Sequence, residues 1–238
     1  MIDIDIFKLF EKNVWPTDQV ELQYNSVFVD LIMTIIFEEN QQFTFVEVGA
    51  LDGKDSLYTK TRFPNCNVHC VEGMSENYNT HLKDITSIST HHICISSTNG
   101  FADFYPKGDG SSGISGIYDR GKIYGTEVRR VPTMTLKKFA ELNSLSTIDA
   151  IKIDVEGATF DVLNSMGSDL LNGIKVMHIE TEDYPFFSNQ KLKKDVAEIL
   201  NNNFTLILQS SYNPQAEGKQ YDEIWVNNAV VHKFTNLR

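Results

Sequence analysis

Residues 45–53 read Phe45-Val46-Glu47-Val48-Gly49-Ala50-Leu51-Asp52-Gly53, and this stretch decides the fold. Its first half is rich in β-branched and aromatic residues, which is typical of a buried strand. In its second half, Gly49 lets the backbone turn tightly, and Gly53 lets a ligand or a helix come close. A helix can follow with Asp55 or Ser56 as its N-cap. A strand, a glycine turn and a helix in this order build the ligand crevice of an open α/β sheet.

A second apolar segment, Asn67 to Val71, predicts the neighbouring strand and is followed directly by Glu72. A carboxylate at the end of such a strand accepts hydrogen bonds from the hydroxyl groups of a ribose. Together the two segments predict a site for a cofactor that contains a nucleoside.

The rest of the chain continues the alternation of strands and helices. Strands are expected at 89–95, 101–105, 148–154 and 174–179, and Ser188 is expected to cap a helix that runs to Leu200. This order predicts a doubly wound, mainly parallel α/β sheet. The last two strands, at 204–208 and 221–226, have no helix between them and should pair antiparallel. We expect a helical extension at 1–42, whose longer helix Thr17 caps, and a cofactor-binding domain at 43–238.

Composition narrows the classes of function. The chain has 238 residues and a formal net charge of −11, which argues against nucleic acid as a partner. Its three cysteines show no zinc-binding spacing, so we expect reduced thiols and a cytoplasmic protein, in keeping with the lack of an opening signal peptide. The apolar stretch from Val27 to Phe37 is too short to span a bilayer, so we expect no membrane insertion.

Residues 107–125 interrupt the regular pattern. The segment from Gly108 to Gly121 holds five glycines and three serines, too many for a helix or a strand. A loop of this length in a compact domain is usually functional or disordered. We expect a mobile lid over the crevice, and the alternative is a plain linker. Basic residues gather around it, and we interpret them as ordinary solvated charge: Arg120, Lys122, Arg129 and Arg130.

The glycine spacing separates the known cofactor motifs. The turn lacks the Gly-x-Gly-x-x-Gly of dinucleotide sites, and the chain has no P-loop. An acidic residue in the strand, Gly-x-x-x-Gly and a downstream Glu resemble S-adenosylmethionine sites instead. A second block strengthens this resemblance: Val131-Pro132-Thr133-Met134-Thr135-Leu136, then Ile148-Asp149-Ala150-Ile151-Lys152-Ile153-Asp154-Val155-Glu156-Gly157-Ala158. From Phe45 to Leu163 the chain resembles the FkbM-type methyltransferases.

The resemblance implies a class I methyltransferase fold, a Rossmann-like sheet of seven strands with the last one antiparallel. It also implies S-adenosylmethionine as the cofactor and an oxygen of a sugar, a glycan or a small secondary product as the methyl acceptor. The residues that it assigns to the cofactor are Glu47, Gly49, Ala50 and Gly53 near the methionine end, Glu72 at the ribose, and Met74, Ile95 and Ser96 at the adenine.

Acidic residues follow two of the predicted strands. Asp154 and Glu156 follow one, and Glu180, Glu182 and Asp183 follow the next. Because the carboxyl ends of parallel strands meet at one edge, these side chains should converge on the crevice. One interpretation is a general base that takes the proton of the acceptor hydroxyl. A second is a Mg²⁺ ion or a similar metal held by Asp154 and Glu180. The third is that the acids cap the next helix or are simply solvated.

Other residues near these strand ends have two interpretations each. Lys152 lies inside a buried strand and needs a carboxylate on an adjoining strand as its partner. We group it with Asp154, Glu156 and Glu180 as the catalytic candidates. His178 is either a base or a core histidine. The aromatic residues Tyr184, Phe186 and Phe187 either wall an acceptor pocket or close the core.

Two other functions remain open at this point. A non-catalytic module that keeps the fold for binding alone would take up the cofactor without turnover. A dinucleotide-dependent reductase would need NAD(P)H, against which the glycine spacing argues. The sequence does not indicate the acceptor or the oligomeric state.

Overall fold

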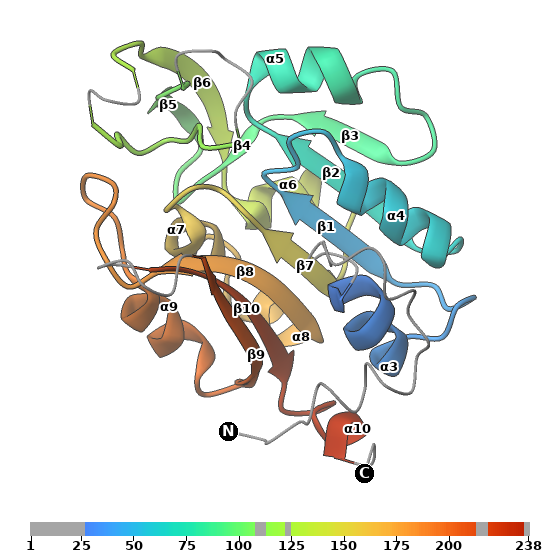
Figure 1. Cartoon of the computed structure of the whole chain (residues 1–238). Coiled ribbons are helices and arrows are strands. Elements are labelled where there is room, and N and C mark those ends of the chain that lie inside the picture. The colour runs from blue at the N-terminus through green and yellow to red at the C-terminus, as the bar shows by residue number, and fades with distance from the viewer. Residues whose placement is uncertain (1–26, 108–112, 122–124, 213–218, 236–238) are drawn as a thin grey trace, which may run out of the picture.

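The computed structural model describes residues 27–107, 113–121, 125–212 and 219–235. Its centre is a seven-stranded sheet in the order β3-β2-β1-β7-β8-β10-β9 (Figure 1). The strands in that order are β3 (Ser89–His92), β2 (Asn67–Glu72), β1 (Thr44–Val48), β7 (Ala150–Ile153), β8 (Val176–Glu182), β10 (Gln220–Asn227) and β9 (Phe204–Tyr212). In this sheet the last strand, β10, runs antiparallel to its neighbours β8 and β9, and the pairs β3–β2, β2–β1, β1–β7 and β7–β8 are parallel. The predicted doubly wound, mainly parallel sheet with an antiparallel last strand is therefore confirmed.

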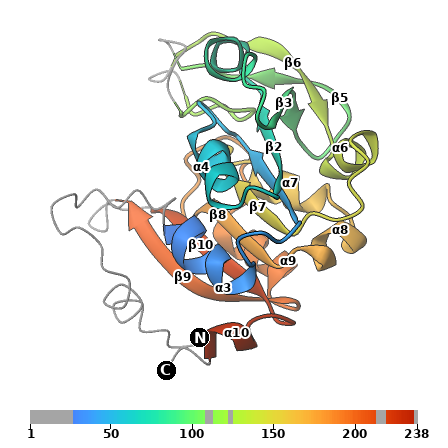
Figure 2. The same cartoon turned by 90° about the vertical axis from the view of Figure 1, so that its right-hand side faces the viewer.

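Helices cover both faces of the sheet (Figure 2). One face carries η1 (Val27–Met33), α3 (Thr34–Ile36) and α4 (Lys54–Arg62), and the other carries α6 (Leu136–Leu142), α7 (Thr159–Asn164), α8 (Ser168–Gly173) and α9 (Lys193–Leu200). Each face of the sheet has its own hydrophobic core. Because side chains alternate along a strand, Phe45 of β1 packs in the core on the side of η1, and Val46 packs in the core on the side of α6 and α7. The short α10 (His232–Thr235) packs near α3. No helix in the described ranges is both long and apolar enough to cross a membrane.

A second, three-stranded sheet lies beside the main one and appears at the upper left of Figure 1. It consists of β4 (Cys94–Ile95), β6 (Arg129–Met134) and β5 (Gly100–Phe104), and α5 (Ser75–Asn77) and η2 (Tyr78–Leu82) follow β2. The single strand expected at 89–95 is wrong, because it is divided between the two sheets. His92 pairs with Glu72, the last residue of β2, so β2 offers no further partner in the main sheet. Cys94 pairs instead with Thr133 of the small sheet.

Two predicted helix starts are also wrong. The N-cap of α4 is Gly53 rather than Asp55 or Ser56, because the carboxylate of Glu47 binds the backbone and the hydroxyl of Ser56. The helix α9 begins at Lys193 rather than at Ser188, whose backbone N–H donates to the carbonyl oxygen of Asp119. The proposed cap Thr17 lies outside the described residues.

Candidate functional site

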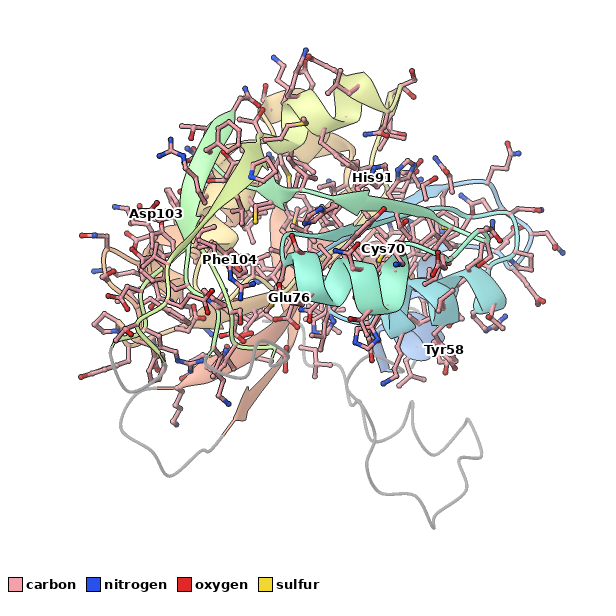
Figure 3. All side chains as sticks on the ribbon, turned by 90° about the horizontal axis from the view of Figure 1, so that it is seen from above. Tyr58, Cys70, Glu76, His91, Asp103 and Phe104 are labelled. Carbon is pink, nitrogen blue, oxygen red and sulfur yellow. The ribbon has the colours of Figure 1, made fainter. Side chains whose placement is uncertain are left out.

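A cavity lies at the carboxyl ends of β1, β2 and β7, and its volume, including the solvent-filled opening, is about 700 Å³. Its walls come from segments that are distant in the sequence. They are Val48, Gly49 and Leu51, Val71 to Gly73, Asn77, Ile93 to Ile95, Phe104 of the small sheet, the described loop residues 113 and 115–117, and Asp154, Val155 and Ala158. Phe104 is labelled in Figure 3, which views the molecule from above.

Glu72 is the buried carboxylate in the cavity wall. Its Oε2 accepts a hydrogen bond from the backbone N–H of Leu51 at 2.8 Å, and its Oε1 accepts one from Met74 at 2.6 Å. Burial raises the pKa of Glu72, and these backbone donors oppose the increase. The carboxylate is thus held in one orientation at the cavity before any ligand binds.

Glycines bring backbone segments together at the floor of the cavity. Gly49 has a φ of +84°, and a Cβ atom there would lie 1.7 Å from the carbonyl oxygen of Asp154. A Cβ on Gly73 would lie 2.0 Å from the sulfur of Cys94. Only glycine fits at these two positions, because any side chain would overlap the neighbouring strand end.

The predicted cofactor residues divide into two groups. Gly49, Glu72 and Ile95 line the cavity. The other five do not line it. Glu47 contacts Ser56 and Lys152, and Ala50 packs with Cys70 and Leu82. Gly53 contacts Leu82, Met74 packs with Phe104 and Val131, and the backbone N–H of Ser96 donates to the carbonyl oxygen of Met134. The part that each of the eight plays in binding stays a prediction. The sequence interpretation did not single out Ile93, Phe104 and Gly116, which join the wall through the small sheet and the loop.

Lys152 lies among three carboxylates below the cavity. Its Nζ is 2.5 Å from Asp55 and 3.6 Å from both Glu47 on the neighbouring strand and Asp154. Burial by itself would lower the pKa of Lys152, but the three carboxylates raise it above its usual value. Burial raises the pKa of Glu47 to about 7, against the opposing effect of Lys152. This arrangement favours the protonated form of Lys152 and provides the carboxylate partners that a buried lysine needs, and its place among the catalytic candidates stays a prediction.

Four acidic side chains, which we call the carboxylate cluster, meet beside the cavity: Asp154, Glu156, Glu180 and Glu182. Carboxylate oxygens of the first three lie within 4.8 Å of one another. Burial and the neighbouring acids raise the pKa of Glu180 well above its usual value and that of Glu156 to about 8. Burial raises the pKa of Glu182 to about 7. Four of the five acids expected to converge thus do so, although Glu180 and Glu182 lie within β8 rather than after it. The fifth, Asp183, instead accepts hydrogen bonds from the backbone of Lys219 and the hydroxyl of Tyr221.

The backbone at Glu156 is strained. Its φ is +51°, a left-handed conformation that is uncommon for glutamate. Strain of this kind often marks a functional position, because the surrounding structure must hold it in place. The conformation turns the chain at the carboxyl end of β7, next to Gly116, where an added Cβ would lie 3.3 Å from that of Glu156.

Arg120 is the basic residue of the loop that reaches this site. Its guanidinium lies 3.3 Å from the carboxylate of Glu156 and 4.9 Å from the ring centre of Phe187. The sequence interpretation treated Arg120 as ordinary surface charge, since 36 residues separate it from Glu156. Phe187 is buried under Gly157, whereas Tyr184 is about half exposed and Phe186 lies between these extremes.

His178 lies deeper in the sheet. Its Nε2 is 3.3 Å from Asp222 on β10, and its ring packs 5.2 Å from that of Phe28. It does not line the cavity described above. This placement favours the interpretation of a core histidine.

The residues of the site suit a nucleoside-containing ligand. Glu72 presents a fixed acceptor to hydroxyl groups, the glycines let the ligand approach backbone, and Ile93, Ile95 and Phe104 offer apolar surface for a flat ring. The carboxylates on the other side can hold a cation or accept a proton.

Comparison with known proteins agrees with this geometry. Residues 47–218 match the sequence profile of the Methyltransferase FkbM domain, which is more than half of the chain. The 2-O-methyltransferase NoeI of Sinorhizobium fredii (strain NBRC 101917 / NGR234) is 24% identical over 179 residues, covering 69% of this chain and 73% of that protein.

Two solved structures of methyltransferases match the chain at low sequence identity. Precorrin-6y C5,15-methyltransferase of Geobacter metallireducens GS-15 matches with a TM-score of 0.47 and 11% identity, over 92% of this chain and 95% of that one. TrmK of M. capricolum, in complex with S-adenosyl-homocysteine, matches with a TM-score of 0.42 and 12% identity, over 82% and 67%.

Proposed function

Since the chain belongs to the family of FkbM methyltransferase domains, we propose that it is an S-adenosylmethionine-dependent enzyme that methylates a hydroxyl oxygen. Its methyltransferase activity and its use of S-adenosylmethionine follow from the family. The oxygen acceptor, its chemical class and the residues that bind and react are the proposed part.

The cavity carries the proposal, and Glu72 is its main feature. We assign Glu72 to the ribose hydroxyls, because its buried carboxylate is already oriented by Leu51 and Met74 at the cavity wall. The apolar wall of Ile93, Ile95 and Phe104 is suited to the adenine ring. The backbone at Gly49 is suited to the methionine end, because it has no side chain between the strand end and the ligand.

Several carboxylates lie beside the cavity, and they support oxygen as the methyl acceptor. A hydroxyl group must lose its proton when it is methylated, and a nearby carboxylate can accept that proton. When bound, S-adenosylmethionine supplies a methyl group that its positively charged sulfur already activates. The chain's own residues must then orient the hydroxyl and take its proton. Asp154 borders both the cavity and the carboxylate cluster, so it is suited to accept that proton. The relative named as a 2-O-methyltransferase supports the choice of oxygen.

We propose a sugar, a glycan or a small secondary product as the acceptor. Tyr184 and Phe186 lie past the end of β8 with their ring centres 5.4 Å apart, and Tyr184 is exposed. The guanidinium of Arg120 lies 5.9 Å from the ring centre of Phe186 and 3.3 Å from the carboxylate of Glu156. Aromatic rings with charged groups close by provide both an apolar surface and polar contacts for a polyhydroxylated molecule.

The test of the cofactor site is calorimetric titration of the full chain with S-adenosylhomocysteine. Glu72→Gln should weaken binding by about 10- to 100-fold, since a hydrogen bond to a charged group contributes about 1.5–3 kcal/mol. The exposed Glu76→Gln is the matched control and should bind as the wild type does. Equal affinity of the Glu72→Gln variant and the wild type would contradict the assignment.

The test of the acceptor uses S-adenosylmethionine with a labelled methyl group and a panel of sugars, hydroxylated aromatics and amines. Label that appears as a methyl ether on a hydroxylated compound supports the proposal. Label that appears only on nitrogen or carbon would contradict it. Tight cofactor binding without turnover on any compound would favour the non-catalytic alternative.

A further inference from the structure

We propose that the carboxylate cluster is a binding site for one hard divalent cation, such as Mg²⁺, with Asp154, Glu156 and Glu180 as its ligands. The inference rests on the proposed function, because the cation would lie beside the cofactor cavity and would hold the acceptor there. It extends that function by defining the acceptor as one with two neighbouring oxygens.

The spacing of the ligands suits such an ion. Their oxygens lie within 4.8 Å of one another, and they come from the end of β7 and from β8. In a six-coordinate Mg²⁺ site, neighbouring oxygens are about 3 Å apart and opposite ones about 4.2 Å apart. The three carboxylates thus surround a space of the right size, and only small side-chain movements are needed to close it. Carboxylate oxygen is also the ligand that Mg²⁺ prefers.

A buried oxygen without a partner gives independent support. Glu180 is 7% exposed, and its carboxyl group shares a hydrogen bond with Asp154, but its Oε1 has no hydrogen-bond partner among the residues that the structure describes. This side chain is part of the group whose oxygens approach one another within 4.8 Å, so its carboxylate is directed into the cluster. Glu182, 2% exposed, also has an unbonded Oε1, while its Oε2 accepts a hydrogen bond from Gln190 at 2.6 Å. Buried polar atoms normally have partners, and a metal ion would supply one here.

The charge of the site points the same way. Arg120 brings one positive charge to Glu156 at 3.3 Å. Lys152 is 3.6 Å from Asp154, but its shortest contact, at 2.5 Å, is to Asp55. Four buried or half-buried acidic side chains thus meet where Arg120 and Lys152 are the positive charges close by. A divalent cation bound among them would stabilise their ionised forms, and burial strengthens that attraction.

The position next to the cavity gives the ion a role. Asp154 lines the cavity, and Gly116 of the cavity wall lies against the side chain of Glu156. Three protein ligands leave coordination positions open, which a hydroxyl and an adjacent oxygen of the acceptor can fill. With the ion bound, Asp154 would serve as a ligand instead of as the base. A hydroxyl held by the ion would lose its proton to solvent more readily, because the positive charge stabilises the resulting alkoxide. The acceptor class is therefore a vicinal diol or a hydroxyl next to a carbonyl oxygen.

The experiment measures binding of Mn²⁺, a paramagnetic probe for such sites, by electron paramagnetic resonance on the full chain without cofactor. We expect one ion per chain, displaced by excess Mg²⁺. Glu180→Gln should weaken binding at least tenfold, because one of three charged ligands is lost. The matched control is Glu141→Gln, an exposed glutamate on α6, which should bind as the wild type does. No stoichiometric binding at millimolar Mn²⁺, or equal affinity in Glu180→Gln, overturns the proposal.

Thermal unfolding keeps the test valid if a variant folds poorly. In EDTA, Glu180→Gln should be at least as stable as the wild type, because it removes an acidic group whose ionised form is unfavourable at this buried position. Added Mg²⁺ should then stabilise the wild type but not the variant. Asp154→Asn replaces Glu180→Gln if the latter does not fold. Titration with S-adenosylhomocysteine in EDTA separates the two proposals: retained cofactor binding with no metal binding overturns only the cation site, and lost cofactor binding with metal binding intact overturns only the cofactor site.

Discussion

At the scale of single residues, Gly49 is the position where the sequence tolerates least change. A Cβ atom there would meet the carbonyl oxygen of Asp154 at 1.7 Å, and its φ is +84°. We therefore expect Gly49→Ala to destabilise the fold by more than about 3 kcal/mol, because both overlap and left-handed strain oppose it.

Gly173 provides the matched control for that change. It ends α8, and an added Cβ would meet nothing within 4 Å. Gly173→Ala should be neutral or stabilise by about 0.5 kcal/mol, since alanine loses less backbone entropy on folding. Urea unfolding of the two variants measures the difference, and similar stabilities would contradict the close approach of the two strand ends.

Lys152 allows a second prediction at this scale. Lys152→Met leaves Glu47, Asp55 and Asp154 without their shared positive charge, so we expect a loss of about 3–5 kcal/mol. Lys175→Met is the control, because the pair of Lys175 with Asp149 is partly exposed and should contribute about 1 kcal/mol or less. Denaturant unfolding checks both, and an equally small effect of the two changes would mean that the buried charges are not coupled.

At the scale of elements, β2 and β3 carry a histidine pair. The Nδ1 of His69 lies 3.0 Å from the Nε2 of His91, and the two rings stack. Burial, followed by the neighbouring His91, lowers the pKa of His69 to about 4, and burial lowers that of His91. Because the folded pKa is below the unfolded value of about 6.5, stability is full above pH 6.5 and is lost as the pH falls toward 4.

The predicted pH effect is measured by comparison with His69→Gln. Between pH 7 and pH 5, the free energy of unfolding of the wild type should fall by about 1–2 kcal/mol more than that of the variant. The comparison removes the contribution of acids such as Glu47, whose raised pKa acts in the opposite direction. If the free energy of unfolding of the two proteins changes with pH in the same way, protonation of the histidine pair does not destabilise the fold, and the prediction is contradicted.

At the scale of the whole molecule, the cofactor should stabilise the folded chain. A ligand at 100 times its dissociation constant contributes about 2.7 kcal/mol. For a chain of this length, S-adenosylhomocysteine should then raise the melting temperature by about 5–10 °C. NADH is the control and should leave it unchanged, because the turn lacks the dinucleotide spacing. A shift with NADH, and none with S-adenosylhomocysteine, would support the reductase alternative.

Local patterns predicted the strands of the sheet better than the ends of its helices. Buried apolar runs such as residues 45–48 and 150–153 identify strands by composition alone. Helix starts depend on which distant groups bind the first N–H groups. Glu47 binds Ser56 across the turn, and Asp119 binds Ser188 from the loop, so neither serine caps its helix.

The sequence by itself determined the order of strands and helices, the glycine turn, Glu72 at the end of β2 and the match to the family, because these depend on residues that are close in the chain. Only the tertiary structure decided which of those residues face the cavity, the contact of Lys152 with Asp55, the approach of Arg120 to Glu156 and the joining of the small sheet to the wall. The reason is physical. A contact over 36 or 97 residues leaves no periodic pattern, since it depends on how the strands pair and on which face of the sheet each side chain falls.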